Sequence, residues 1–359
     1  MTDRMVKWFL EMVQIPSESG NEAAMMEYLL REVRALGGEA DLDAYGNLIA
    51  TFPGRGCRDG AEPILLSCHA DTVKPGVGIV PVIEGDVIRS QGDTILGADD
   101  KAGIAEVLEA LATAGVRPPV ELAVSRQEEV GLLGVKNLDF SRIRSRKGFL
   151  VDNDTLETIV IGGPSYFALD VTVTGRAAHA GMEPERGINA VAAASRAIAA
   201  LSLGRLDAGT TANVGVIQGG LIRNGVPASC TFLAECRSAD HERAVQLNEE
   251  MCAIIRREVE AAGAAVEIRS ENLCRAVSIP EDAEPVLVAQ RALATVGIDA
   301  SCVFITGFTD ASIYNNRGIQ MAVVGTGGRD EHSTDESIAV ADMEKAVAML
   351  VEVMRLTAA

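Results

Sequence analysis

Three apolar runs in this chain end in polar side chains, and helical patterns separate them. The runs are "EPILLSCHAD" (62–71), "PVELAVSRQEE" (119–129) and "KGFLVDND" (147–154). Between the first two, "DDKAGIAEVLEALATAG" (99–115) has the spacing of a helix with a glycine at its carboxyl end. Strands that alternate with helices predict an α/β domain with a mainly parallel, doubly wound sheet. The same pattern returns late in the chain, so we assign residues 1–165 and 277–359 to this domain.

The middle of the chain has a different pattern. "YFALDVTVTG" (166–175) and "ASCTFLAECRS" (228–238) alternate apolar and polar residues with a period of two. This alternation is typical of antiparallel strands with one exposed face. Two helical stretches lie among these strands, so residues 166–276 are predicted to form an inserted, ferredoxin-like α+β domain.

Composition excludes several classes of partner. The formal net charge of −19 argues against nucleic acid, which requires a basic surface, and against an anionic membrane surface. No apolar run approaches the roughly 18 residues of a membrane span, and the amino terminus lacks the features of a secretory signal. The seven cysteines are odd in number and form no CxxC pair, which favours a reducing, cytoplasmic location.

Polar residues gather where the predicted strands end. In an open α/β sheet, ligands bind at the carboxyl ends of the strands. Each residue alone has an ordinary explanation, such as a helix cap, a turn or a solvated pair of charges. Their joint occurrence points instead to one site. The residues are His69, Asp71, Asp99, Glu128, Glu129, Asp152 and His332.

Imidazoles and carboxylates without thiolates are a ligand set for zinc or a similar divalent ion. Five of these residues are candidate ligands: His69, Asp99, Glu129, Asp152 and His332. Five ligands are too many for one catalytic zinc, but they suit two ions that share one carboxylate. Two ions about 3.5–4 Å apart can hold a hydroxide and polarise a carbonyl group. Asp71 points to the same side as His69 in an extended chain and could accept its second ring N–H.

The motifs "GADDKAG" (97–103), "EEVGLLG" (128–134), "VDND" (151–154) and "GRAAHAG" (175–181) then reveal a resemblance. Together with the late histidine, they resemble the di-zinc family of peptidase T, carboxypeptidase G, aminoacylase and succinyl-diaminopimelate desuccinylase. The peptidase T branch is the most similar. The resemblance implies a di-zinc hydrolase of amide bonds with an inserted lid domain, often a homodimer through that lid.

The resemblance also implies a role for each matched residue. His69 and Asp152 would hold one zinc, Glu129 and His332 the other, and Asp99 would bridge them, with Co²⁺ or Mn²⁺ as substitutes. Glu128 would be the general base and acid. His179 would stabilise the oxyanion, in dimeric members from the partner subunit. Asn224 and Arg237 would bind the carboxylate or backbone of the substrate.

One segment departs from the family pattern. In "ITGFTDAS" (305–312), Thr306 and Phe308 stand where the tripeptidases have an arginine and a glycine. Three substrate classes therefore remain open. They are di- and tripeptides cleaved by an aminopeptidase, N-acyl amino acids cleaved by an acylase, and the substrates of a carboxypeptidase. A binding module with a decayed site is disfavoured by the full ligand set. A nucleotide enzyme is disfavoured because "GTGGRD" lacks the GxGxxG spacing.

Overall fold

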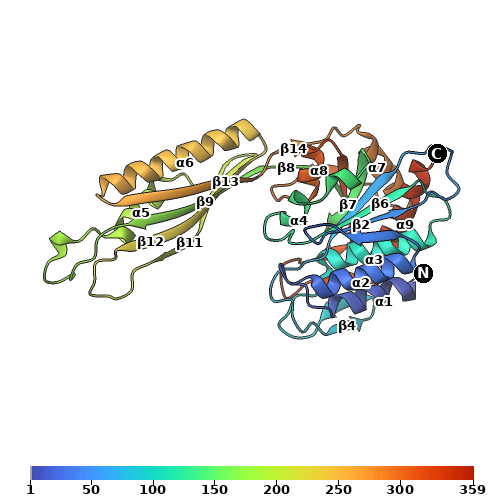
Figure 1. Ribbon diagram of the computed structural model, residues 1–359, viewed down its shortest axis with the longest axis horizontal. Helices are drawn as coiled ribbons and strands as arrows, with labels where there is room; N and C mark the ends of the chain where they lie inside the picture. The colour runs from blue at the N-terminus through green and yellow to red at the C-terminus, as the bar shows by residue number, and fades with distance from the viewer. Residues whose placement is uncertain (1) are drawn as a thin grey trace. The chain divides into compact units, whose positions relative to one another are not determined.

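The computed structural model describes residues 2–359, which form two compact units (Figure 1). Unit 1 contains the described chain up to Gly162 together with Ser278–Phe304 and Thr309–Ala359. Unit 2 contains Gly163–Val277 and the short segment Ile305–Phe308.

The central sheet of unit 1 is mixed. Its nine described strands follow the order β1-β2-β6-β3-β7-β16-β8-β14, and β15 pairs with β8. The middle strands β6, β3, β7 and β16 run parallel, whereas β1, β2 and β8 each pair antiparallel with a neighbour. The α/β class predicted from the sequence is confirmed, with antiparallel strands beside a parallel centre. The strands are β1 (Glu39–Leu42), β2 (Leu48–Phe52), β3 (Ile64–His69), β6 (Val120–Ser125), β7 (Lys147–Asn153), β8 (Thr158–Gly163), β14 (Val277–Ser278), β15 (Ser301–Phe304) and β16 (Gln320–Gly325).

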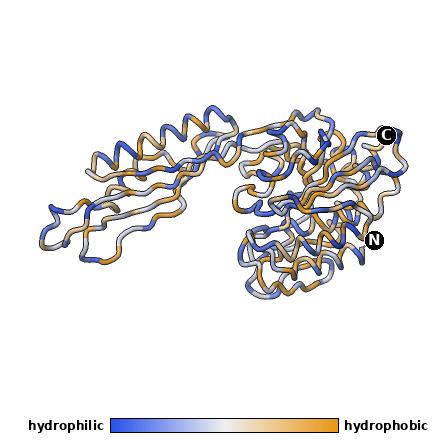
Figure 2. Tube along the Cα trace, viewed as in Figure 1, coloured by the Kyte–Doolittle hydropathy of each residue, from blue (hydrophilic) through white to orange (hydrophobic). Residues whose placement is uncertain are grey.

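The central strands are continuous apolar runs because helices cover them. Every side chain of β3 and β6 is buried. Helix α3 (Ala98–Thr113) packs on β3 and β7, and α7 (Glu284–Thr295) packs on β7 and β16. Helices α1 (Thr2–Val13) and α9 (Val340–Thr357) pack against α3. Figure 2 shows hydrophobic residues concentrated on these central elements.

Smaller elements complete unit 1. Helix α2 (Ala23–Ala35) packs on β1 and β2, and α4 (Leu133–Lys136) contacts α8 (Ala311–Asn316). A second sheet has the order β17-β18-β5-β4, which no pattern in the sequence predicted. Its strands are β4 (Pro81–Glu84), β5 (Val87–Ser90), β17 (Gly328–Arg329) and β18 (Ser337–Ala339). The loop between β17 and β18 carries His332.

Unit 2 is an antiparallel sheet with the order β10-β11-β12-β9-β13. Along β12, Cys230, Phe232, Ala234 and Cys236 are buried, while the alternate residues are exposed or half-buried. Two helices, α5 and α6, cover the buried face. The predicted antiparallel α+β module is therefore present, with the ferredoxin-like order of four strands extended by β10. The elements are β9 (Ser165–Thr174), α5 (Ala190–Ala200), β10 (Gly204–Asp207), β11 (Thr210–Gly219), β12 (Ser229–Ser238), α6 (His241–Ala261) and β13 (Ala265–Cys274).

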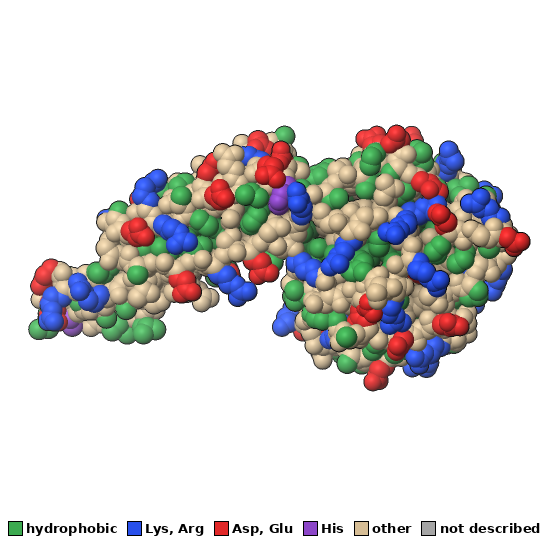
Figure 3. Space-filling model, turned by 45° about the horizontal axis from the view of Figure 1, so that its top comes forward, with side chains coloured by type: hydrophobic (Ala, Val, Ile, Leu, Met, Phe, Trp, Pro, Cys, Tyr) green, Lys and Arg blue, Asp and Glu red, His purple; other side chains and the backbone are tan. Residues whose placement is uncertain are grey.

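Among residues 2–359, no helix combines the length and apolar character needed to cross a bilayer. All seven cysteines are free thiols. On the face drawn in Figure 3, acidic and basic side chains are interspersed, and hydrophobic side chains show at the loop end of unit 2.

Candidate active site

The predicted residues of unit 1 come together where the parallel strands end. His69 is the last residue of β3, and Asp152 lies near the end of the adjacent β7. Glu128 and Glu129 lie in the turn after β6, and Asp99 lies at the start of α3. The parallel pairing of β3 with β6 and with β7 brings these segments to one edge, as expected for an α/β sheet.

The carboxylate of Asp99 lies between two histidines. Its Oδ1 is 3.0 Å from Nε2 of His69, and its Oδ2 is 3.0 Å from Nε2 of His332. A second carboxylate approaches each imidazole: Asp152 Oδ1 is 3.4 Å from His69 Nε2, and Glu129 Oε1 is 3.0 Å from His332 Nε2. The five candidate ligands thus form two sets of three donors that share Asp99.

Asp100 also lies close to this group. A carboxylate oxygen of Asp100 lies within 4.8 Å of ligand atoms of His69 and Asp152, close enough for the three to share a metal ion. However, Asp100 is fully buried, and its Oδ2 accepts the main-chain N–H of His69 at 3.1 Å. This hydrogen bond ties one oxygen of Asp100 to the backbone of β3, and its other oxygen has no hydrogen-bond partner among the described residues. Asp99, in contrast, directs one oxygen to each histidine.

The negative charges of the candidate ligands and of Glu128 are not balanced by the positive side chains around them. Burial, together with neighbouring carboxylates, raises the pKa of Glu128 and of Asp152, although His69 lowers both. Burial also opposes ionisation of Asp99, but hydrogen bonds from the two histidines hold its pKa below the usual value. In the described chain, the basic side chains that contact the five-residue group are its own two imidazoles. Buried carboxylates need a compensating positive charge, so this donor set fits divalent cations.

The main chain of Asp71 orients the imidazole of His69. Nδ1 of His69 lies 3.0 Å from the carbonyl oxygen of Asp71 and 3.6 Å from its carboxylate Oδ1. Since a carbonyl oxygen only accepts, Nδ1 carries a proton, and Nε2, which faces Asp99 and Asp152, is the nitrogen that would bind a metal ion. We expected the carboxylate of Asp71 as the acceptor; the shorter distance is to its carbonyl group instead.

The carboxylate of Asp71 instead holds the turn that carries the two glutamates. It accepts the main-chain N–H groups of Glu128 at 2.9 Å and Glu129 at 3.2 Å, and the hydroxyl of Ser19 at 2.7 Å. Gln127, just before them, has the left-handed backbone angle φ of +52°. Asp71 therefore fixes a bent backbone, which lets adjacent glutamates point in different directions. Ser19 was not identified from the sequence.

Glu128 is buried but its carboxylate is free of hydrogen bonds to the described residues, which leaves it available to a ligand. Asp310 lies close enough to contribute to the raised pKa of Glu128. The carboxylate of Asp310 accepts the Ser125 hydroxyl at 2.5 Å, and burial raises its pKa to about 7. A buried carboxyl with a raised pKa is suited to exchange protons near neutral pH.

His179 and Asn224 lie on neighbouring loops of unit 2. The main-chain N–H of Ala180 donates to the carbonyl oxygen of Asn224 at 3.0 Å. Nδ1 of His179 accepts the N–H groups of Gly181 and Met182 at 3.2 and 3.1 Å. Nδ1 therefore carries no proton, and the exposed ring presents Nε2–H as a hydrogen-bond donor.

Arg237 is engaged within unit 2. Its guanidinium pairs with Glu235 through two hydrogen bonds of 3.1 and 3.0 Å, and Nη1 donates to the carbonyl oxygen of Thr306 at 3.1 Å. It also lies 4.4 Å from the ring centre of Tyr166, which stacks on Phe308. The two residues that depart from the family pattern are thus neighbours of Arg237. A substrate carboxylate would compete with Glu235 for this guanidinium.

Below the site, α3 contains a buried carboxyl without a partner. Both oxygens of Glu106 lack a hydrogen bond to any described residue, and burial followed by the charge of Asp100 raises its pKa well above the usual value. At pH values between the pKa of Glu106 in the unfolded chain and its higher pKa in the folded chain, the folded chain binds more protons than the unfolded chain. The free energy of unfolding of the wild type therefore falls as the pH rises through this range.

Replacement of Glu106 by methionine should raise the free energy of unfolding at pH 8 by about 1–3 kcal/mol, because it removes an unsatisfied buried group. The gain should shrink at pH 5.5, measured by urea unfolding of chelator-treated protein. Glu109→Met is the matched control on the same helix, since Glu109 is buried but pairs with Arg4 at 2.7 and 2.9 Å. A Glu106→Met protein no more stable than Glu109→Met would contradict this account.

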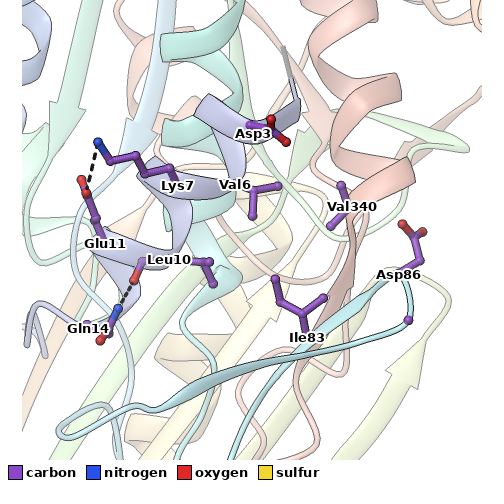
Figure 4. Close-up of a pocket in the computed structure, with 10 residues that line it drawn as sticks. Asp3, Val6, Lys7, Leu10, Glu11, Gln14, Ile83, Asp86 and Val340 are labelled. Atoms are coloured by element: carbon purple, nitrogen blue, oxygen red, sulfur yellow. Dashed lines mark hydrogen bonds and ion pairs between the residues drawn. The ribbon is translucent and has the colours of Figure 1, made fainter.

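A surface pocket of about 490 Å³ lies elsewhere on unit 1, between α1 and the β4–β5 hairpin (Figure 4). Val6, Leu10 and Ile83 provide apolar walls, and charged side chains surround them. None of the predicted site residues lines this pocket. Among the described residues, the side chains that line it form no group with the spacing of metal ligands.

Two family profiles match the chain. The M20-type peptidase dimerisation domain matches residues 164–262, which make up most of unit 2. Peptidase family M28 matches residues 47–171, a range that includes β3, α3, β6 and β7.

Known proteins are similar over nearly the whole chain. The structure of aminopeptidase PepT from Bacillus cereus is 32% identical, covers 100% of this chain and 99% of that one, and has a TM-score of 0.90. A tripeptidase from Staphylococcus aureus is 30% identical with the same coverage and a TM-score of 0.94. Acetylornithine deacetylase from Myxococcus xanthus is 30% identical over 91% of this chain and 90% of that protein. The similarity therefore extends through both units.

Proposed function

This chain belongs to the M20 peptidase family and is peptidase T-like, and we propose that it hydrolyses amide bonds in short peptides. The proposed cofactors are two divalent metal ions, preferably Zn²⁺. One observation carries the proposal. The two oxygens of Asp99 each face one histidine, beside a buried glutamate whose carboxylate is free of hydrogen bonds. This is the arrangement that two ions and a general base require.

The residues that would hold the ions follow from the distances. His69 and Asp152 would hold one, Glu129 and His332 the other, and Asp99 both. Bound there, the ions would supply Lewis-acid activation of a water molecule and of the amide carbonyl group. Zinc suits the nitrogen and oxygen donors, and Co²⁺ or Mn²⁺ could replace it.

Glu128 would move the protons of the reaction. Its carboxylate is free of hydrogen bonds to the described residues and lies near His69 and Asp152, where it would accept a proton from the attacking water and pass it to the leaving amine. Asp71 holds Glu128 through the backbone, so the base stays aimed at one point. Its neighbour Glu129 would serve as a ligand instead.

His179 would donate its Nε2–H to the oxyanion that forms on the carbonyl group. The two N–H groups that bind its Nδ1 support this role, because they fix the ring as a donor.

We propose that the chain forms a homodimer through unit 2, which the match to a dimerisation domain supports, and that His179 acts within its own chain or from the partner subunit. Asn224 and Arg237 would bind the substrate backbone or carboxylate. We also predict a cytoplasmic protein.

The substrate class is tested by a panel. We expect the metal-loaded protein to cleave di- and tripeptides with a free amino terminus at least about tenfold faster, in kcat/KM, than N-acetyl amino acids. Release of the amino-terminal residue, followed by mass spectrometry, identifies an aminopeptidase. The acetylornithine deacetylase relative makes the acylase the second candidate. Preference for N-acetyl amino acids, or release of the carboxyl-terminal residue, would contradict the aminopeptidase proposal.

A further inference from the structure

Glu336 is a buried carboxylate that receives three main-chain N–H groups from the segment before α3. Its Oε2 accepts the N–H groups of Leu96 and Gly97, each at 2.7 Å. Its Oε1 accepts the N–H of Asp99 at 3.0 Å. Only 2% of Glu336 is exposed, so these hydrogen bonds are protected from water. Glu336 belongs to neither set of metal donors, and it is not the proposed general base.

The backbone of residues 96–99 is shaped to bind an anion. Gly97 has the left-handed angle φ of +74°, and the residues around it present several N–H groups to one side. The amino-terminal end of α3 adds a favourable dipole for a negative charge. Glu336 occupies this position from a loop about 240 residues away in the sequence, so it fixes that loop to the start of α3.

The same loop carries His332, four residues before Glu336. His332 and Glu336 therefore meet Asp99 at two points. The ring of His332 approaches the side-chain Oδ2 at 3.0 Å, and the carboxylate of Glu336 binds the main-chain N–H at 3.0 Å. With these two contacts, neither the loop nor the start of α3 can shift without the other.

We infer that Glu336 is a positioning residue, which sets the shared carboxylate of Asp99 in register with His332 and so shapes the second metal site. The inference rests on the proposed function as far as the metals are concerned. The clamp, by which we mean the three hydrogen bonds from the N–H groups of Leu96, Gly97 and Asp99 to Glu336, is a property of the protein without metal. It predicts an effect on metal binding and turnover that exceeds any loss of stability.

The test is the Glu336→Gln variant, which keeps the size of the side chain but offers only one oxygen to three N–H groups. Glu121→Gln is a matched control, because Glu121 is also buried and also accepts main-chain N–H groups, from Arg144 and Ser145 at 2.9–3.0 Å. Glu121 lies near the start of β6, whereas the site lies beyond the end of that strand. Both variants lose comparable hydrogen bonds, but only Glu336→Gln loses hydrogen bonds next to the candidate metal ligands.

We expect Glu336→Gln to weaken the binding of Zn²⁺ at one of two sites by about 10- to 100-fold, measured by calorimetric titration of metal-free protein. At metal concentrations that saturate the wild type, kcat should fall while KM changes little. Glu121→Gln should bind Zn²⁺ and turn over substrate as the wild type does. If the glutamine variant does not fold, Glu336→Asp replaces it, since its shorter carboxylate reaches fewer of the three N–H groups.

Hydrogen–deuterium exchange of the metal-free protein gives a readout that does not depend on metals or activity. Peptides covering residues 95–100 should exchange faster in Glu336→Gln than in wild type or Glu121→Gln. Equal exchange and equal Zn²⁺ affinity in the two variants would overturn the inference. A wild-type chain that binds no Zn²⁺ would overturn the proposed function instead, and the exchange measurement would then decide the clamp alone.

Discussion

Replacement of Glu128 by glutamine is expected to lower kcat by about 10²- to 10⁴-fold, the range typical of a lost general base. Glutamine keeps the shape of the side chain but cannot accept a proton. Metal content should stay at the wild-type value, because the carboxylate of Glu128 is not within either set of three donors. Steady-state kinetics on the best peptide of the panel, with elemental analysis of the same sample, measures both effects.

The adjacent residue supplies the control for this variant. Glu129→Gln should lose affinity for one metal ion, because Oε1 of Glu129 lies 3.0 Å from Nε2 of His332 within one donor set. The two substitutions are chemically identical and one residue apart, so a difference in metal content can only come from the two positions. Wild-type turnover in Glu128→Gln, or equal metal loss in both variants, would show that the assignment is wrong.

The second large effect is expected at Asp99. Asp99→Ala removes the donor that both sets share, so affinity for both ions should fall by more than about 100-fold and turnover should fall towards the uncatalysed rate. Calorimetric titration with Zn²⁺ measures the affinities, and peptide hydrolysis measures the turnover. Asp154→Ala is a suitable control, since Asp154 is an exposed aspartate after β7 whose side chain accepts the main-chain N–H of the neighbouring Thr155 at 2.7 Å. If Asp99→Ala bound two ions as tightly as Asp154→Ala, Asp99 would not be the shared ligand.

The parallel centre of unit 1 could be predicted because its strands are long apolar runs with polar ends. Every residue of β3 and β6 is buried, so the runs stand out from their flanking segments. The second sheet could not be predicted in this way. Its strands have two to four residues and several exposed positions, which is too short for a period to be recognised.

His69, Glu129 and Asp152 could be grouped from the sequence because parallel strands bring their carboxyl ends to one edge. Asp99 and His332 reach the same group from the start of α3 and from the loop between β17 and β18. Positioning residues give no such signal. Glu336 and Ser19 act through hydrogen bonds to groups far away in the sequence, and neither stands in a local pattern that indicates this contact. The role of the Asp71 carboxylate was likewise hidden, because it depends on the bend at Gln127.

Arg237 illustrates the opposite case, in which a local signal was present. Residues two apart in a strand point to the same face, so Glu235 in "ECR" was placed to pair with Arg237. The pair changes the expected behaviour of this arginine, because its charge is already compensated. A substrate carboxylate therefore gains less from Arg237 than it would from a free guanidinium.

The number of metal ions bound by the wild-type chain tests the central claim most directly. Elemental analysis of protein purified without chelator, and of the same protein after incubation with Zn²⁺ and gel filtration, gives this number per chain. The arrangement of two donor sets around Asp99 predicts about two ions, and activity that disappears when they are removed and returns when they are restored. A chain that binds none and still hydrolyses peptides at the same rate would contradict the account.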